Sequence, residues 1–258
     1  MRAPLILVHG FLGSCEDWKP VLDCLPNDQE GHAPILPGHA GIPLDLFPGP
    51  HTFDAAVGWL ASTVEAYRSG DLNPHQGGGP CDVLGYSMGG RLALGLMIER
   101  PDLVRRVVAV GASAGIEDLD ERAARAALDE QRAREIEEGP FEAWLERWYA
   151  QPLFDGLRDT QGFEALLARR RQGQPRALAE ALRMMTVGRQ PPLGHRLAET
   201  EVPLLLMAGS EDAKYTASNS ALAARSPSIQ AVTVPGAGHA PHLEQPDEFS
   251  RLLRLFLK

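Results

Sequence analysis

The sequence predicts an α/β protein in which helices cover both faces of a mostly parallel β-sheet. Short, continuous apolar runs that end at glycine or proline are typical of strands buried on both faces. These runs alternate with stretches of helical spacing, which is the order of βαβ units. A long interval without a strand pattern in the middle of the chain predicts a helical insertion in the sheet order.

Six apolar runs are predicted as strands. They occupy residues 5–8, 33–36, 81–86, 104–110, 203–208 and 231–234. Three stretches in which apolar side chains recur every three or four residues are predicted as helices. They occupy residues 52–68, 91–100 and 248–257. Pro101 directly follows the second of these helices and fits its end.

The strand-free interval covers residues 117–192 and is rich in Ala, Arg, Glu, Leu and Trp. Open α/β sheets bind their ligands at the carboxyl ends of the strands, so helices inserted there would cover the binding place. We therefore predict an α/β core of residues 1–116 and 193–258 and a helical cap of residues 117–192. The sequence contains no internal repeat.

Composition narrows the range of partners. The chain has 258 residues, of which 44% are hydrophobic, so it is long enough and apolar enough to bury a core. Its net charge is −9, with 34 acidic and 25 basic residues, whereas a nucleic-acid surface needs a basic excess. No apolar run approaches the roughly 18 residues of a membrane span. We expect neither a nucleic acid nor a membrane as partner.

The cysteines and the first residues of the chain indicate its cellular compartment. Cys15, Cys24 and Cys81 are odd in number and show no Cys-x-x-Cys spacing, so we expect neither disulfides nor a zinc site. The start has one basic residue, Arg2, and an apolar run too short for a secretory signal. A cytoplasmic location is the resulting expectation.

The segment Gly85-Tyr86-Ser87-Met88-Gly89 matches the nucleophile-elbow pattern G-x-S-x-G. A predicted strand runs into it and a helical pattern runs out of it. A serine at such a turn is strained and exposed, and its neighbours must be small because the chain reverses sharply. The helix N-terminus adds free N–H groups and a positive partial charge. This context favours a catalytic Ser87 over a chance match in a glycine-rich turn.

A catalytic serine needs a base, and the base needs an orienting acid. Three histidines follow Ser87 in the chain, namely His195, His239 and His242. His239 directly follows a predicted strand within a run of small residues, so we favour it as the base. His242 is the nearer rival, and His195 lies close to the end of the insertion.

The acid is expected in the loop after the preceding strand, because the chain order in this kind of site is serine, acid, histidine. Glu211 and Asp212 both occupy that loop. Position along the chain does not separate them, and for either residue the alternative is a solvated loop carboxylate.

An oxyanion hole needs two N–H donors. The residue after the nucleophile, Met88, is expected to supply one, and Phe11 in the loop after the first strand is expected to supply the other. His9 precedes that loop, and we expect it to brace the loop rather than to act as a base.

The motifs resemble the α/β-hydrolase superfamily along the whole chain. The resemblance rests on His9-Gly10-Phe11-Leu12-Gly13 with Trp18, on Leu36-Pro37-Gly38-His39, and on Gly85-Tyr86-Ser87-Met88-Gly89-Gly90-Arg91. The insertion is similar to the cap of the 2-succinyl-6-hydroxy-2,4-cyclohexadiene-1-carboxylate synthase family of menaquinone biosynthesis. That similarity rests on Gly115-Ile116-Glu117-Asp118, Glu121-Arg122-Ala123-Ala124-Arg125 and Trp148-Tyr149-Ala150-Gln151-Pro152-Leu153-Phe154, and the blocks around Asp212 and His239 fit the same family.

The resemblance implies a triad of Ser87, Asp212 and His239 with Phe11 and Met88 as oxyanion donors. It implies a lyase that eliminates pyruvate from 2-succinyl-5-enolpyruvyl-6-hydroxy-3-cyclohexene-1-carboxylate, begun by proton abstraction from a ring carbon. The serine would then act as a base and would not be acylated. No cofactor or metal is implied.

The resemblance also implies a small polycarboxylate substrate. Arg91, Arg125 and Arg170 match family arginines that hold its carboxylates, and Tyr86 and Trp148 match pocket aromatics. Arginine suits this task because its planar guanidinium donates two parallel hydrogen bonds to a carboxylate.

The sequence leaves two other classes of protein open. One is a carboxylesterase or carbon–carbon bond hydrolase with the same triad, since the fold alone does not separate chemistries. Arg91, Arg125 and Trp148 argue against it, because an apolar ester has no use for a cationic pocket. The other is a non-catalytic receptor, against which the retained triad argues. We expect a monomer or a small homo-oligomer.

Overall fold

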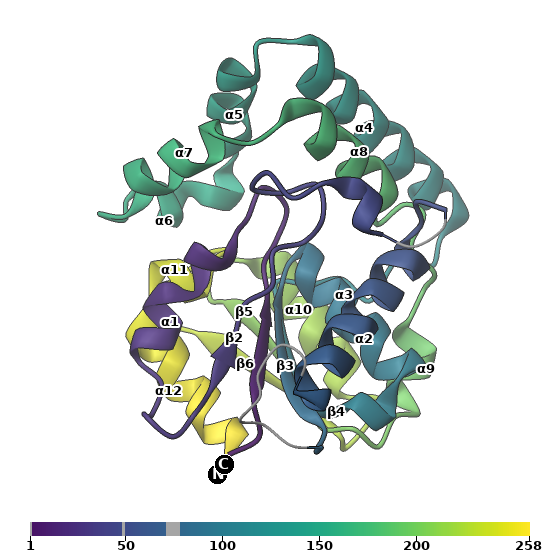
Figure 1. Ribbon diagram of the computed structural model, residues 1–258, viewed down its shortest axis with the longest axis vertical. Coiled ribbons are helices and arrows are strands. Elements are labelled where there is room, and N and C mark those ends of the chain that lie inside the picture. Colours follow the sequence, from purple (N-terminus) through teal and green to yellow (C-terminus); the bar gives the residue numbers. More distant parts are fainter. Residues whose placement is uncertain (1, 48–49, 71–77) are drawn as a thin grey trace.

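One parallel β-sheet organises the computed structural model, which describes residues 2–47, 50–70 and 78–258 (Figure 1). Its strand order is β2-β1-β3-β4-β5-β6, and every neighbouring pair is parallel. The strands are β1 (Leu5–Val8), β2 (Gly31–His32), β3 (Cys81–Tyr86), β4 (Val104–Val110), β5 (Leu204–Gly209) and β6 (Ile229–Val234). The predicted fold class is confirmed.

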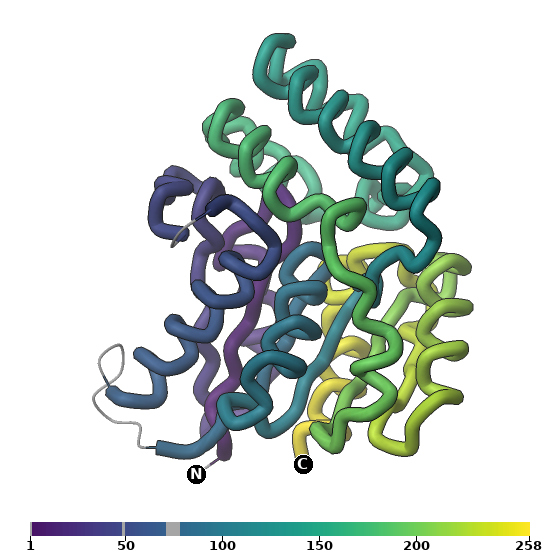
Figure 2. Tube along the Cα trace, turned by 90° about the vertical axis from the view of Figure 1, so that its right-hand side faces the viewer, coloured from purple at the N-terminus to yellow at the C-terminus, as the bar shows by residue number. Residues whose placement is uncertain are grey.

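Helices cover both faces of this sheet because its side chains alternate between two apolar layers. One layer packs against α2 (Phe53–Ser69), α3 (Met88–Glu99), α9 (Gly194–Ala198) and α10 (Ala213–Ala223). The other packs against α1 (Lys19–Asp23) and α12 (Pro246–Leu257). Figures 1 and 2 show the two helical layers on opposite sides of the strands.

A third group of helices follows β4 and lies beyond the carboxyl ends of the strands (Figure 1). These helices are α4 (Leu119–Glu138), α5 (Phe141–Tyr149), α6 (Asp155–Arg158), α7 (Phe163–Arg171) and α8 (Pro175–Met184), and we call them the cap helices. They enclose an apolar cluster of their own that includes Trp144 and Leu182, and Leu12 and Ala240 of the core pack into it. The interval between β4 and β5, which the structure describes throughout, contains no strand.

The prediction of a strand at residues 33–36 is wrong. The second strand covers only Gly31–His32, where it pairs with β1. Pro34 has no N–H to give to a strand ladder. The N–H of Leu36 donates instead to Nε2 of His9, 3.0 Å away, so the segment serves a loop.

Other predicted boundaries differ from the observed ones by a few residues. The strand predicted at 231–234 begins at Ile229, and the helix predicted at 91–100 begins at Met88, directly after the serine. Across the described ranges, no helix combines the length and apolarity that crossing a membrane requires.

Candidate active site

Ser87 occupies the turn between β3 and α3 with φ 50° and ψ −109°, a conformation that L-residues rarely adopt. The turn is held from both sides. The N–H of Ser87 donates to the carbonyl of Val110 at 2.8 Å, and its carbonyl accepts the N–H of Arg91 at 3.0 Å. A Cβ on Gly89 would lie 2.2 Å from the carbonyl oxygen of Val8, and one on Gly85 would lie 2.4 Å from that of Gly89. Small neighbours therefore let the strand and the helix meet this closely.

His239 and Asp212 form a buried pair. The Nδ1 of His239 lies 2.7 Å from Oδ2 of Asp212, and each side chain is at most 5% exposed. Asp212 follows β5 and caps α10, where its Oδ1 accepts the N–H of Tyr215 at 3.3 Å. His239 lies in the loop after β6. Of the two acids left open by sequence, Asp212 is thus the one that contacts this histidine, while Glu211 is exposed.

The other two histidines have different surroundings. His195 is exposed on α9 and pairs with Glu199 at 3.2 Å. His242 is buried among aromatic rings, 4.5 Å from Tyr86 and 4.7 Å from Trp18 between ring centroids. Burial lowers the pKa of His242 to about 3, so this imidazole is neutral.

Ser87 and His239 line one cavity of about 190 Å³, which Tyr86 and the cap residues Trp148 and Arg170 also border. A second cavity of about 100 Å³ adjoins it, because both are lined by Ser87 and by Arg125, among others. Both cavities lie between the core and the cap helices. The site is therefore a divided space over the serine, covered by helices that come from one insertion.

Phe11 and Met88 border the second cavity beside Ser87. Met88 is the first residue of α3, so its N–H has no acceptor within the helix. Phe11 lies in the loop after β1 and contacts Trp148 edge to face, with ring centroids 5.8 Å apart. Phe11, from the loop after β1, and Met88, from the start of α3, thus border the same cavity as Ser87.

His9 holds the first of these loops. Its Nδ1 lies 2.8 Å from the carbonyl of Gly10, and its Nε2 accepts the N–H of Leu36. Nδ1 therefore carries the proton and Nε2 does not. Burial lowers the pKa of His9 to about 4, so the ring stays neutral and keeps both hydrogen bonds.

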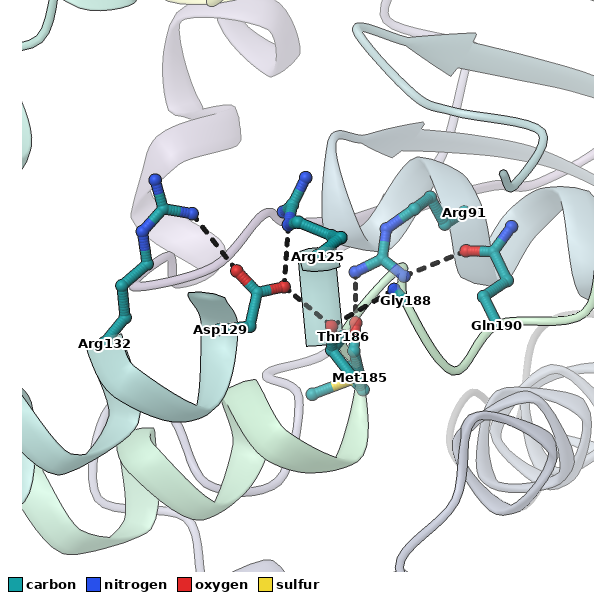
Figure 3. A network of polar contacts seen from close by, with 8 residues as sticks. All are labelled: Arg91, Arg125, Asp129, Arg132, Met185, Thr186, Gly188 and Gln190. Carbon is teal, nitrogen blue, oxygen red and sulfur yellow. Dashed lines mark hydrogen bonds and ion pairs between the residues drawn. The ribbon is translucent and has the colours of Figure 1, made fainter. Parts of the chain in front are cut away.

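Arg91 reaches from α3 into the second cavity and is buried. Its guanidinium donates to Oε1 of Gln190 at 2.9 Å and to the carbonyl of Met185, both of them neutral groups (Figure 3). Burial lowers its pKa to about 10, which still leaves it charged at neutral pH. A buried cation held only by neutral acceptors is costly, and a ligand carboxylate would offset that cost.

Arg125 and Arg132 share one buried carboxylate on α4 (Figure 3). The Oδ2 of Asp129 lies 2.9 Å from Nε of Arg125, and its Oδ1 lies 3.1 Å from Arg132. The Thr186 hydroxyl donates to the same carboxylate at 2.7 Å. The guanidinium of Arg132 lies 5.3 Å from the ring centroid of Trp148. Two cations on one anion leave this wall of the site positive.

Arg170 is more fully compensated than the other two arginines. Its Nη2 donates to Oδ2 of Asp17 at 2.6 Å and its Nε to the hydroxyl of Tyr149 at 3.2 Å. Burial, the largest single effect, opposes ionisation of Asp17, but the charge and hydrogen bond of Arg170 together with His9 and the Ser14 N–H outweigh it and lower the pKa of this carboxyl. Burial raises the pKa of Tyr86, which shares the cavity, so that phenol stays protonated.

Sequence reasoning missed several residues of this site. Asp17, Tyr149 and Gln190 hold the arginines, and Lys214 and Tyr215 border both cavities. Lys214 and Tyr215 stand just after Asp212, and that proximity is the signal that could have found them. The others have no local pattern, because their roles depend on contacts between distant segments.

A strained serine after a strand, a histidine–aspartate pair beside it and a helical cover define an α/β-hydrolase fold with its characteristic site. The alpha/beta hydrolase family model matches residues 5–252. The chain is 31% identical to 2-succinyl-6-hydroxy-2,4-cyclohexadiene-1-carboxylate synthase of Enterobacter sp. (strain 638), over 98% of this chain and 93% of that protein. It is 31% identical to the Escherichia coli O1:K1 / APEC protein of the same name, over 94% and 88%.

A solved structure of MenH from S. aureus superimposes with a TM-score of 0.89 at 26% identity, over 99% of this chain and 93% of that one. The chain belongs to the alpha/beta hydrolase family and, within it, to the 2-succinyl-6-hydroxy-2,4-cyclohexadiene-1-carboxylate synthase family.

The close approach at the elbow gives a first testable expectation. We expect Gly89→Ala in α3 to destabilise the protein by about 1–3 kcal/mol, because the new methyl group would force β1 away from the helix. Gly58→Ala in α2 is the matched control. Gly58 is exposed with open space around it, so alanine should stabilise the helix by about 0.5–1 kcal/mol. Urea unfolding measures both, and a stable Gly89→Ala variant would contradict the steric argument.

The buried His242 gives a pH dependence. Because its folded pKa lies below its unfolded value, the unfolded chain binds the extra proton first as pH falls. The stability that the neutral ring contributes is full above about pH 6.5 and declines toward pH 3 by about 1.4 kcal/mol per pH unit. His242→Phe keeps an aromatic ring among its neighbours and removes this slope. Urea unfolding at about pH 6 and pH 5 should therefore show a flatter decline in the variant, and equal slopes would refute it.

Proposed function

We propose that this chain is a lyase that eliminates pyruvate from 2-succinyl-5-enolpyruvyl-6-hydroxy-3-cyclohexene-1-carboxylate to give 2-succinyl-6-hydroxy-2,4-cyclohexadiene-1-carboxylate. The shared name of its full-length relatives supports this reaction. The observation that carries it is Arg91, a buried cation beside Ser87 that has neutral hydrogen-bond acceptors. A polycarboxylate substrate supplies the anion that such a pocket lacks.

In this proposal Ser87, His239 and Asp212 act as a proton-transfer chain. His239 takes the serine proton, and Asp212 orients the ring and stabilises its charged form. The serine oxygen removes a proton from a ring carbon, and the electron pair of that C–H bond enters the new diene. The C–O bond to the enolpyruvyl group breaks, and the leaving group takes a proton from His239 to become pyruvate. The enzyme returns to its starting protonation state.

The remaining residues bind and stabilise. The N–H groups of Phe11 and Met88 would donate to the oxygen on which negative charge develops. Arg91 and Arg125 would hold substrate carboxylates, and Tyr86 and Trp148 would pack against the ring system. Arg170 would border the carboxylate nearest α7. The cap helices would exclude water, which strengthens each of these charge interactions.

Removal of the serine hydroxyl tests the reaction. We expect Ser87→Ala to lower kcat for pyruvate release by at least about 10³-fold, because the proton has no other acceptor at that position. Pyruvate and the new diene are measured separately in the same sample. The wild-type protein with p-nitrophenyl acetate is the comparison. Rapid ester turnover without pyruvate release would overturn the lyase in favour of a hydrolase.

The cationic pocket gives a second expectation. Arg91→Met should lower kcat/KM by about 10- to 100-fold, because a charge-assisted hydrogen bond to substrate is worth roughly 1.5–3 kcal/mol. Arg189→Met is the matched control, since Arg189 is exposed close to the Gln190 that holds Arg91. Circular dichroism establishes that both variants are folded before they are assayed. Unchanged kinetics in Arg91→Met would remove the argument for a carboxylate site there.

A further inference from the structure

A buried ion pair joins the cap to the core at one point beside the site. Asp17 belongs to the short 3-10 helix η1 (Cys15–Trp18), which follows the β1 loop, and Arg170 belongs to the last turn of α7. Their Oδ2 and Nη2 atoms are 2.6 Å apart, and each side chain is 5% exposed. The two residues are 153 positions apart in the chain, so this contact exists only when the cap is seated on the core.

The same carboxylate also holds the loop that carries Phe11. The Oδ2 of Asp17 accepts the N–H of Ser14 at 3.1 Å, at the end of that loop. Within the loop, the N–H of Gly13 donates to the carbonyl of Gly10 at 3.0 Å, and His9 contacts that carbonyl as well. One oxygen atom thus receives a bond from the cap and a bond from the loop.

The packing around this oxygen leaves little freedom. A Cβ on Gly13 would lie 2.9 Å from Oδ2 of Asp17 and 2.7 Å from Nδ1 of His9, so the loop backbone is pressed against both side chains. Arg170 is held on its other side by Tyr149 of α5, and it borders the cavity that contains Ser87. A shift of α7 would therefore be transmitted to Asp17 and from there to the loop.

We propose that Asp17 is a positioning residue that couples the seating of the cap to the geometry of the β1 loop, so that the oxyanion donor Phe11 and the cap residue Arg170 reach their working positions together. The catalytic part of this inference rests on the function proposed above. Arg170 then acts chiefly as the cap side of the contact. Its charge is already balanced by Asp17, whereas the charge of Arg91 is free to attract substrate.

Kinetics test the coupling through a double-mutant cycle of Asp17→Asn and Arg170→Gln, assayed with the enolpyruvyl substrate. We expect each single variant to lower kcat and raise KM, about 10-fold in kcat/KM or more, because Asp17→Asn weakens the contacts to both the loop and the cap and Arg170→Gln removes the contact through which the cap holds Asp17. The kcat/KM of the double variant should be no lower than that of the less active single variant. The double variant also contains no isolated buried charge, so it keeps the test valid where a single variant is too unstable to assay.

If the losses in kcat/KM of the two single variants multiply in the double variant, the proposal is overturned. It is also overturned if folded Asp17→Asn keeps the kcat and KM of the wild type. A residue that only supports the fold would lower the melting temperature and leave both constants unchanged. Asp23→Asn on α1 is the matched control, because Asp23 forms an exposed ion pair with Lys19 and is expected to leave the kinetics as in the wild type.

Hydrogen exchange tests the same coupling without any substrate. In Asp17→Asn, amides of residues 9–14 and of α7 should exchange faster together, while those of α2 on the other side of the core keep their wild-type rates. Faster exchange in only one of the two segments would contradict the coupling. This measurement stays decisive if the protein proves to catalyse a different reaction, so failure of the coupling and failure of the proposed function are separable.

Discussion

The turn at Ser87 requires a strand, a helix and a second strand to meet almost in contact. A residue with φ 50° is costly unless its surroundings hold it, and here β1, β4 and α3 all do so. The distance from a Cβ on Gly89 to the Val8 carbonyl leaves no space for a side chain. This approach fixes where β1 ends, and the loop after β1 carries His9 and Phe11. The position of the serine and the position of the loop beside it are consequences of one steric constraint.

The buried charges around this turn fall into two groups, paired and unpaired. Asp17 with Arg170, and Asp129 with two arginines, are ion pairs in which each carboxylate is compensated within the protein. Arg91 is different, because its partners are an amide and a carbonyl. The compensated ion pairs hold the geometry of the site, because breaking one leaves an unpaired buried charge. An uncompensated buried cation instead attracts an anionic ligand. The distinction separates residues that build the site from the residue best suited to bind in it.

Much of the core could be predicted from the sequence because its signals are local. Apolar runs such as 81–86 and 104–110 coincide with β3 and β4, since strands buried on both faces leave a continuous pattern. The run at 33–36 failed because Pro34 lacks a donor and Leu36 bonds to a histidine from another segment. Chain order placed the acid in the loop after β5 but left Glu211 and Asp212 open, and only the family resemblance implied Asp212, the residue that contacts His239. The contact of Asp17 with Arg170 could not be predicted, because it depends on how the cap docks, and no local pattern records that.

Cavity size alone would have misplaced the site. A hollow of about 850 Å³, larger than either cavity beside Ser87, lies between α1, α7 and the loop before α12 and does not include Ser87. Its ionisable lining is mainly acidic, with five carboxylates against Lys19 and Arg169; the five are Glu16, Asp23, Asp159, Glu211 and Glu244. Such a wall repels a polycarboxylate. The smaller cavities beside Ser87 carry arginines and the histidine–aspartate pair. The charge and geometry of the lining residues therefore identify the site, whereas cavity volume would select the wrong space.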